Sequence, residues 1–175
     1  FAQGPDIKYS AATEASSASA GSTLRAVFTF NLGDTWHVNA HKPLDEFLIP
    51  TVFTLVPEGG ISAGELVYPD HMLFELGGDK LAVYEHTFNI GVVLQIAADA
   101  TPGEHKLQGT LKYQACNNEM CFPPAKLPVE ITVVVGDDGV AANPELFAAV
   151  KWPEGNTPTV APESQTAAPE VPPAA

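Results

Sequence analysis

Apolar and polar residues alternate with a period of two in several segments of the first 135 positions. Residues 23–30 show the pattern most clearly, because every second side chain is apolar and the residues between are polar or mixed. Alternation of this kind is typical of half-buried β-strands, and turn-forming residues separate the runs. The pattern predicts about eight strands. They are expected at residues 7–10, 23–30, 36–39, 47–56, 61–68, 83–96, 107–113 and 127–135.

Two segments depart from this alternation. Residues 69–81 contain apolar side chains that follow neither a strand nor a helix period, so we interpret the segment as an irregular loop or a flap over a site. Residues 143–150 fit two helical turns, with Asn143 as the N-terminal cap. The remaining pattern, short strands joined by turns, predicts an all-β protein. An antiparallel β-sandwich of the immunoglobulin type is the natural architecture.

The ends of the chain differ from the middle. From Pro153 onward the residues are almost all Pro, Ala, Thr, Glu and Ser, with Val as the only larger apolar type, a composition that buries no core, and a disordered linker is expected over residues 151–175. Residues 1–4 are expected to be disordered or the remnant of a signal peptide, with cleavage after Ala2. One domain is therefore expected over residues 5–150. Because a linker usually connects two modules, we expect a further module beyond Ala175.

Charge narrows the classes of partner. The chain of 175 residues carries a formal net charge of −13 at pH 7, which disfavours binding to nucleic acid or to an anionic membrane surface. It has no apolar run of the roughly eighteen residues that a membrane-spanning helix needs.

The only two cysteines, Cys116 and Cys121, stand between the last two predicted strands. Asn117 and Asn118 lie between them and favour a turn, so the local pattern predicts a hairpin with a tight turn. Cysteines that flank such a turn can approach to the Cα separation of roughly 4.4–6.8 Å that a disulfide requires. When an exported protein has a single pair of cysteines, the pair is usually found oxidised to a disulfide.

Such a disulfide can be a structural bridge or a reagent. Closing so short a ring stabilises the fold by only about 2 kcal/mol on the chain-entropy model, and a chain of this length needs no such bridge. A short loop followed by the rigid Pro123-Pro124 pair is better suited to presenting thiols to partners. An exported scaffold or binding module with a structural disulfide stays open as an alternative. So does a Cu(I) site made by Cys116, Met120, Cys121 and a histidine, although no histidine has a ligand-like spacing to the cysteines.

The block at residues 113–124, YQACNNEMCFPP, resembles the active-site block of the N-terminal periplasmic domain of the thiol:disulfide interchange protein DsbD family. The motifs WHVN at residues 36–39 and VY at residues 83–84 fall where that family has comparable strands. The resemblance covers roughly residues 5–135. It implies an immunoglobulin-like redox module of the periplasm, tethered to the inner membrane in the full-length protein through a membrane domain beyond Ala175.

The resemblance also implies roles for residues and partners. Cys121 corresponds to the cysteine that exchanges with partner disulfides, and Cys116 to the cysteine that resolves the mixed disulfide. The module would receive electrons from a thioredoxin-like domain of the same protein and pass them to periplasmic disulfide isomerases or other thioredoxin-like clients. No cofactor or metal is implied besides the redox-active disulfide. Residues 69–81 correspond to a cap loop that shields the pair, with Phe74, Leu76, Gly77 and Gly78 as its site-shielding part.

Five further residues are candidates for positions beside the cysteines: Trp36, His37, Tyr113, Glu119 and Phe122. Tyr113, Glu119 and Phe122 belong to the cysteine block itself. Glu119 would raise rather than lower the pKa of a nearby thiol, so the pair does not look like an acidified nucleophile. Packing in the core is the preferred interpretation of Trp36. A polar surface position and a position at the site are equally compatible with His37.

Overall fold

The computed structural model describes residues 4–153, and the expected signal-peptide remnant and the predicted disordered linker lie almost wholly outside these residues. The regular secondary structure of the described chain is almost entirely β, as predicted. Its elements are β1 (Lys8–Thr13), β2 (Thr23–Asn31), β3 (His37–Asn39), β4 (Val52–Leu55), β5 (Ile61–Val67), β6 (Met72–Leu76), β7 (Asp79–Glu85), β8 (Thr87–Ile96), β9 (Gly103–Tyr113), β10 (Ala115–Cys116), β11 (Ala125–Val135) and α1 (Pro144–Ala148).

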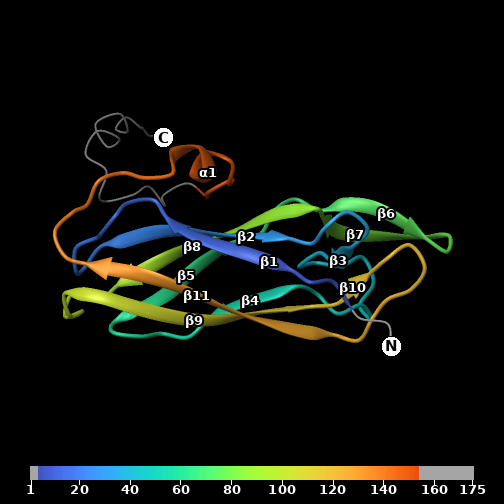
Figure 1. Cartoon of the computed structure of the whole chain (residues 1–175), viewed down its shortest axis with the longest axis horizontal. Helices are drawn as coiled ribbons and strands as arrows, with labels where there is room; N and C mark the ends of the chain where they lie inside the picture. Colours follow the sequence, from blue (N-terminus) through green and yellow to red (C-terminus); the bar gives the residue numbers. More distant parts are fainter. Residues whose placement is uncertain (1–3, 154–175) are drawn as a thin grey trace, which may run out of the picture.

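Two antiparallel sheets form a sandwich (Figure 1). One has the strand order β1-β2-β8-β5 and the other has the order β11-β9-β4. Phe53 of β4 crosses the interface, with its ring centroid 4.7 Å from that of Phe28 and 6.3 Å from that of Phe30 on β2. We call the apolar cluster between the sheets the sandwich core. Its largest fully buried members include Leu24, Phe28, Phe30, Val38, Phe53, Ile61, Ile90, Leu94, Leu107 and Leu111.

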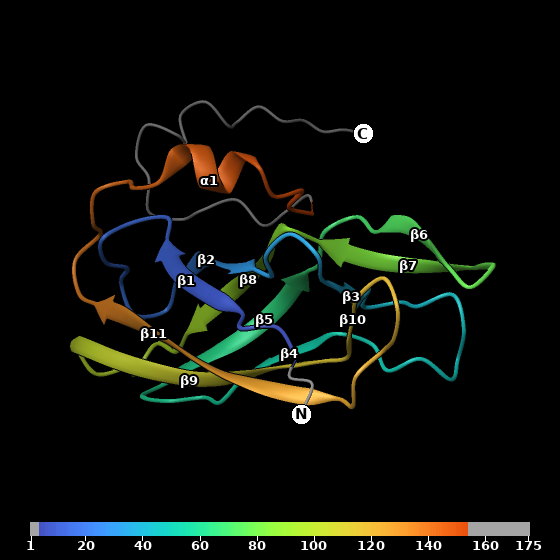
Figure 2. The same cartoon turned by 45° about the vertical axis from the view of Figure 1, so that its right-hand side comes forward.

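A third sheet, β10-β3-β7-β6, lies at one end of the sandwich (Figure 2). Side chains alternate between the two faces of a strand. One face of this sheet, with Val38, Ala82, Tyr84 and Ala115, packs into the sandwich core. The other face points away from the core. It is this second face that positions the cysteine pair.

The short helix α1 and the residues after it cover the outer face of the first sheet, where Phe147 and Val150 pack on Val27 of β2. The prediction for Asn143 is wrong in one respect. Asn143 occupies the cap position with φ of 56°, but its side chain makes no capping bond and donates to the carbonyl of Thr13 instead. The helix spans five residues rather than two full turns. Within residues 4–153, no helix is long and apolar enough to cross a membrane.

Three loop and strand predictions need correction. The single strand expected at residues 83–96 is two strands of different sheets, β7 and β8, separated by His86 with φ of 57°. Residues 47–50, expected to be extended, belong to a turn before β4. Residues 69–81, expected to be irregular, contain β6 and the start of β7, which form an antiparallel hairpin. The sequence pattern does not show this hairpin because Met72 and Leu73, adjacent in β6, are both exposed, at 53% and 60%. A strand that lacks a continuous buried face lacks the alternation that identifies strands.

Candidate functional site

The cysteine segment is not the tight turn of a simple hairpin. Strands β9 and β11 pair until Tyr113 and Ala125, and the residues between them leave that sheet. There the chain forms β10, which pairs with β3 in the third sheet, so that Cys116 lies opposite His37. The segment thus connects the sandwich to the end sheet. The local residue pattern cannot show this switch, because a two-residue strand has no periodicity of its own.

Cys116 and Cys121 form a disulfide, and their Cα atoms are 3.9 Å apart. This separation is shorter than the expected range, and the two residues also face each other as an antiparallel bridge. The backbone N–H of Phe122 donates to the carbonyl of Ala115 (2.8 Å) on one side of the bridge. On the other side, the N–H of Asn117 donates to the carbonyl of Met120 (2.9 Å).

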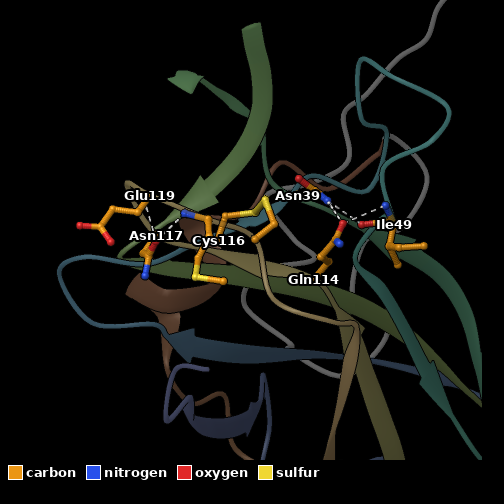
Figure 3. The surroundings of a disulfide bond; sticks show 8 residues. Asn39, Ile49, Gln114, Cys116, Asn117 and Glu119 are labelled. Atoms are coloured by element: carbon orange, nitrogen blue, oxygen red, sulfur yellow. Dashed lines mark hydrogen bonds between the residues drawn. A yellow bond between two sulfur atoms is a disulfide. The ribbon is translucent and has the colours of Figure 1, made fainter. Parts of the chain in front are cut away.

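Asn117 forms the turn between the cysteines, as the sequence suggested. Its side-chain Oδ1 accepts hydrogen bonds from the backbone N–H groups of Glu119 and Met120, both at 2.8 Å. Figure 3 shows Asn117 and Glu119 beside Cys116. Glu119 itself is exposed. A side chain that bonds the backbone two residues ahead is the usual reason for asparagine at such a turn.

The two sulfur-bearing residues differ in exposure. Cys116 is fully buried, at 0% exposed, whereas Cys121 is half-buried. An attacking thiolate needs access to one sulfur of a disulfide along the S–S axis, and the other sulfur leaves. Access therefore favours attack at Cys121, with Cys116 as the leaving sulfur.

His37 is buried beside Cys116, so a surface position for it is wrong. The side chain is only 2% exposed, and its ring centroid lies 4.2 Å from that of Phe74. On the other side of β3, His37 lies opposite Glu85 of β7. Burial lowers the pKa of His37, and the carboxylate of Glu85 partly opposes this effect. The Nε2 atom of His37 is buried without a hydrogen-bond partner.

A polar network next to the cysteines was not predicted. The amide nitrogen of Asn39 donates to Oε1 of Gln114 (2.9 Å) and to the carbonyl of Ile49 (3.0 Å), and the N–H of Ile49 donates to Gln114 Oε1 (3.3 Å). Figure 3 shows these three residues beside the disulfide. The network fixes the loop before β4 against the end sheet. The only sequence signal was an asparagine inside a predicted strand, which is an unfavourable residue there unless it has a specific partner.

The predicted cap residues lie on the β6–β7 hairpin. Gly77 and Gly78 form its two-residue turn with φ of 63° and 92°, values that favour glycine and suit a turn of this length. Phe74 and Leu76 are half-buried, and neither belongs to the sandwich core. Phe74 packs on His37, the residue opposite Cys116. The hairpin therefore places an aromatic ring on the residue opposite Cys116, while Gly77 and Gly78 lie at its exposed tip.

The aromatic candidates split between the core and the site. Trp36 is half-buried and packs against the sandwich core, which is the preferred interpretation. It also contacts Phe122, the residue after Cys121, with the ring centroids 5.1 Å apart. Tyr113 is buried in the core at the end of β9, and burial raises the pKa of its hydroxyl. Within residues 4–153, no group of three or more His, Cys, Asp or Glu side chains is arranged to hold a metal.

The family model described as the N-terminal domain of the thiol:disulfide interchange protein DsbD matches residues 8–132, more than half of the chain. Among solved structures, the N-terminal periplasmic domain of ScsB from Proteus mirabilis is similar, with 16% identity and a TM-score of 0.50, over 71% of this chain and 45% of that chain. The reduced DsbD N-terminal domain from Neisseria meningitidis is 18% identical with a TM-score of 0.42, over 67% of this chain and 82% of that chain.

A third similar structure is the complex between the DsbD and PilB N-terminal domains from Neisseria meningitidis, with 18% identity and a TM-score of 0.40, over 69% of this chain and 81% of that chain. No curated protein matches the chain. Together with the antiparallel sheets, the comparisons confirm the predicted immunoglobulin-like β-sandwich.

Proposed function

The chain belongs to the family of N-terminal domains of the thiol:disulfide interchange protein DsbD, and on this premise we propose that it relays electrons through the Cys116–Cys121 disulfide. The domain accepts reducing equivalents from a thioredoxin-like domain and passes them to disulfide-bonded partners. The observation that carries the proposal is the asymmetry of the pair. One sulfur belongs to a half-buried residue at the end of the sandwich, and the other belongs to a fully buried residue.

The proposed exchange has two steps in each direction. A partner thiolate attacks Sγ of Cys121, the S–S bond breaks, and Cys116 leaves with the electron pair. A second thiolate of the partner then attacks the partner's own sulfur in the mixed disulfide and releases Cys121. The domain gains two electrons and two protons, and the partner becomes a disulfide. Reduction of a client runs through the same steps in reverse.

The family and the fold also support proposals on location and partners. We assign the domain to the periplasm, where the similar ScsB domain is placed by its description. The electron donor would be a thioredoxin-like domain of the same full-length protein, with a membrane domain beyond Ala175. Disulfide isomerases and other thioredoxin-like proteins would be the clients. The disulfide is the redox group, and the proposal involves no other cofactor.

Single cysteine variants test the proposed roles. Cys116→Ser leaves the half-buried Cys121 as a lone nucleophile, so it should accumulate a stable mixed disulfide with a thioredoxin-like protein whose second cysteine is replaced by serine and whose remaining cysteine is activated as an aromatic mixed disulfide. Cys121→Ser leaves only the fully buried Cys116, so it should form no adduct and transfer no electrons. Mass spectrometry and non-reducing electrophoresis give the readout. The opposite pattern of adducts would reverse the assignment, and no adduct with either variant would exclude the relay.

The remaining candidate functions predict different results. If the disulfide is a structural bridge in a scaffold module, Cys121→Ser should lose several kcal/mol of stability, rather than the about 2 kcal/mol expected for a short ring. In the wild-type domain, a thioredoxin-like protein should then reduce the Cys116–Cys121 disulfide no faster than a small thiol does. If the site binds Cu(I), the reduced wild-type domain should take up one equivalent of copper, and the Cys116→Ser variant should take up none. Fast reduction by a thioredoxin-like protein and slow reduction by a small thiol favour the relay.

A further inference from the structure

The end sheet has a row of three reactive side chains, two buried and one half-buried, on the face that points away from the sandwich core. Cys116 of β10, His37 of β3 and Glu85 of β7 are direct neighbours across three adjacent strands. Directly opposite residues in antiparallel strands carry their side chains on the same face, with Cβ atoms about 4.5–5.5 Å apart. A thiol, an imidazole and a carboxylate therefore stand in one line, in the order that general acid–base chemistry at sulfur requires.

His37 has a feature that packing does not explain. Its Nε2 atom is buried without a hydrogen-bond partner, although the side chain is only 2% exposed. A buried polar atom without a partner destabilises a fold, and such atoms in native proteins call for a specific explanation. If His37 served only to pack against Phe74, a phenylalanine or leucine would fill the space without this cost. By strand pairing, the two reactive residues directly opposite His37 are Cys116 on one side and Glu85 on the other, and of these only Cys116 takes part in the disulfide.

Cys116 needs such a group because it is fully buried. When it leaves as a thiolate, or must become a thiolate to attack, it carries a negative charge in a site that water does not reach. A charge in such a place is costly unless a partner neutralises it or a proton removes it.

We propose that His37 accepts the proton of Cys116 when Cys116 resolves a mixed disulfide on Cys121, and returns a proton to Cys116 when the disulfide is reduced. This inference rests on the proposed exchange function. In the resolving step, the S–H bond of Cys116 breaks and its proton moves to the imidazole. The sulfur of Cys116 bonds to Sγ of Cys121, and the client leaves as a thiolate. The imidazolium then gives its proton to this departing thiolate, so that protons and electrons balance.

The surroundings of His37 suit a base that is neutral at rest. Burial lowers its pKa, so the imidazole is free to accept a proton at neutral pH. Glu85 favours the imidazolium once it has formed. The titratable groups that face His37 from the paired strands are Cys116 on β10 and Glu85 on β7, while β6 contributes the phenyl ring of Phe74. His37 is 2% exposed and Cys116 is fully buried, so a proton transfer between them takes place away from bulk water.

A two-phase reaction with a chromogenic aromatic disulfide tests the proposal. The reduced domain releases a first coloured thiolate when Cys121 attacks the probe, at a rate proportional to probe concentration. It releases a second when Cys116 resolves the mixed disulfide, at a rate independent of that concentration. His37→Gln should leave the first phase unchanged and slow the second by roughly a hundredfold or more, the usual contribution of a positioned acid or base.

The pH profile separates a proton transfer from a structural effect. In the wild-type domain, the second-phase rate should level off above the pKa of His37, which lies below its ordinary value of about 6.5. In His37→Gln the rate should keep rising with pH towards the ordinary thiol pKa of about 8.5. His37→Phe, which restores apolar packing on Phe74, should be as slow as His37→Gln. If His37 had a purely packing role, His37→Phe would react like the wild type.

Two further variants complete the test. Glu85→Gln, at a half-buried strand end, should slow the second phase by a smaller factor, and it decides the matter if neither His37 variant folds. His105→Gln alters a half-buried histidine of β9, far along the strand from Tyr113, and should change neither phase. The proposal would be overturned if His37→Gln released the second thiolate at the wild-type rate. It would also be overturned if this variant slowed both phases equally.

The probe reaction also keeps this inference separate from the proposed relay. It uses a small disulfide and needs no protein partner. If a thioredoxin-like protein failed to reduce the domain while the two phases and their dependence on His37 remained, the relay would fail and the role of His37 would stand. In the reverse result, the relay works but the rate of the second phase does not depend on His37. The proposed relay function would then stand, and the proposed role of His37 would be wrong.

Discussion

The sandwich core and the outward face of the end sheet are both buried, yet they are built on opposite principles. The core is apolar, and Phe53 fits between Phe28 and Phe30 without any polar group to satisfy. The outward face of β10-β3-β7 buries Cys116, His37 and Asn39, and leaves His37 Nε2 and Asn39 Oδ1 without partners.

The difference separates stability from reactivity within one small fold. An apolar core contributes free energy in proportion to the area it removes from water, and it gains nothing from a polar atom. A buried polar atom without a partner costs stability, so its presence indicates another use for the position. In this domain, the unpartnered nitrogen lies in the strand next to the disulfide. The two regions should therefore respond differently to substitution.

The largest effect is expected from the sandwich core. Phe53→Ala should lower the free energy of unfolding by about 3–5 kcal/mol, because it removes a fully buried ring from between two others. The rate at which a small disulfide probe reacts with the reduced domain should not change. Urea unfolding measures the first quantity and stopped-flow absorbance the second. Val56→Ala, at an exposed position just after β4, is the control and should change neither. A large change in probe reactivity would mean that core and site are coupled.

An intermediate effect is expected from the hairpin that carries the cap residues. Phe74→Ala should lower stability by only about 1 kcal/mol, because the ring is half-buried and outside the sandwich core. If the ring shields the disulfide, small thiols should reduce Cys116–Cys121 several times faster in this variant. Leu73→Ala changes the exposed neighbour on the same strand and is the matched control. An unchanged reduction rate, together with a stability loss as large as that of Phe53→Ala, would show that Phe74 is a core residue.

The smallest effect concerns pH and should appear only on the outward face. Burial lowers the pKa of His37 in the folded state, so between that value and the ordinary one of about 6.5 the unfolded chain binds a proton that the folded chain does not. Stability should therefore be retained above pH 6.5 and fall as the pH drops through this window, by at most about 1.4 kcal/mol per pH unit. In His37→Gln this contribution is absent. Parallel stability curves for the two proteins would show that the pKa of His37 is unshifted.

The sequence was sufficient for the fold class and for the reactive pair. Alternation with a period of two is a local property of a strand with one buried face, and β2, β8, β9 and β11 all show it. The cysteine block is contiguous, so its resemblance to a known family was visible without coordinates. The role of Asn117 as a turn former was equally local, because its bonds reach only two and three residues ahead.

Only the tertiary structure decided how the site is assembled. Strand β10 has two residues and no pattern, and its pairing with β3 joins residues nearly eighty positions apart in the chain. That single long-range pairing buries Cys116 and sets His37 opposite it. It therefore decides between the site position and the surface position for His37, which the sequence left open. The β6–β7 hairpin escaped recognition for a related reason, since its exposed side chains carry no periodic signal. Local patterns report which face of a strand is buried, whereas the identity of the neighbouring strand depends on the packing of the whole chain.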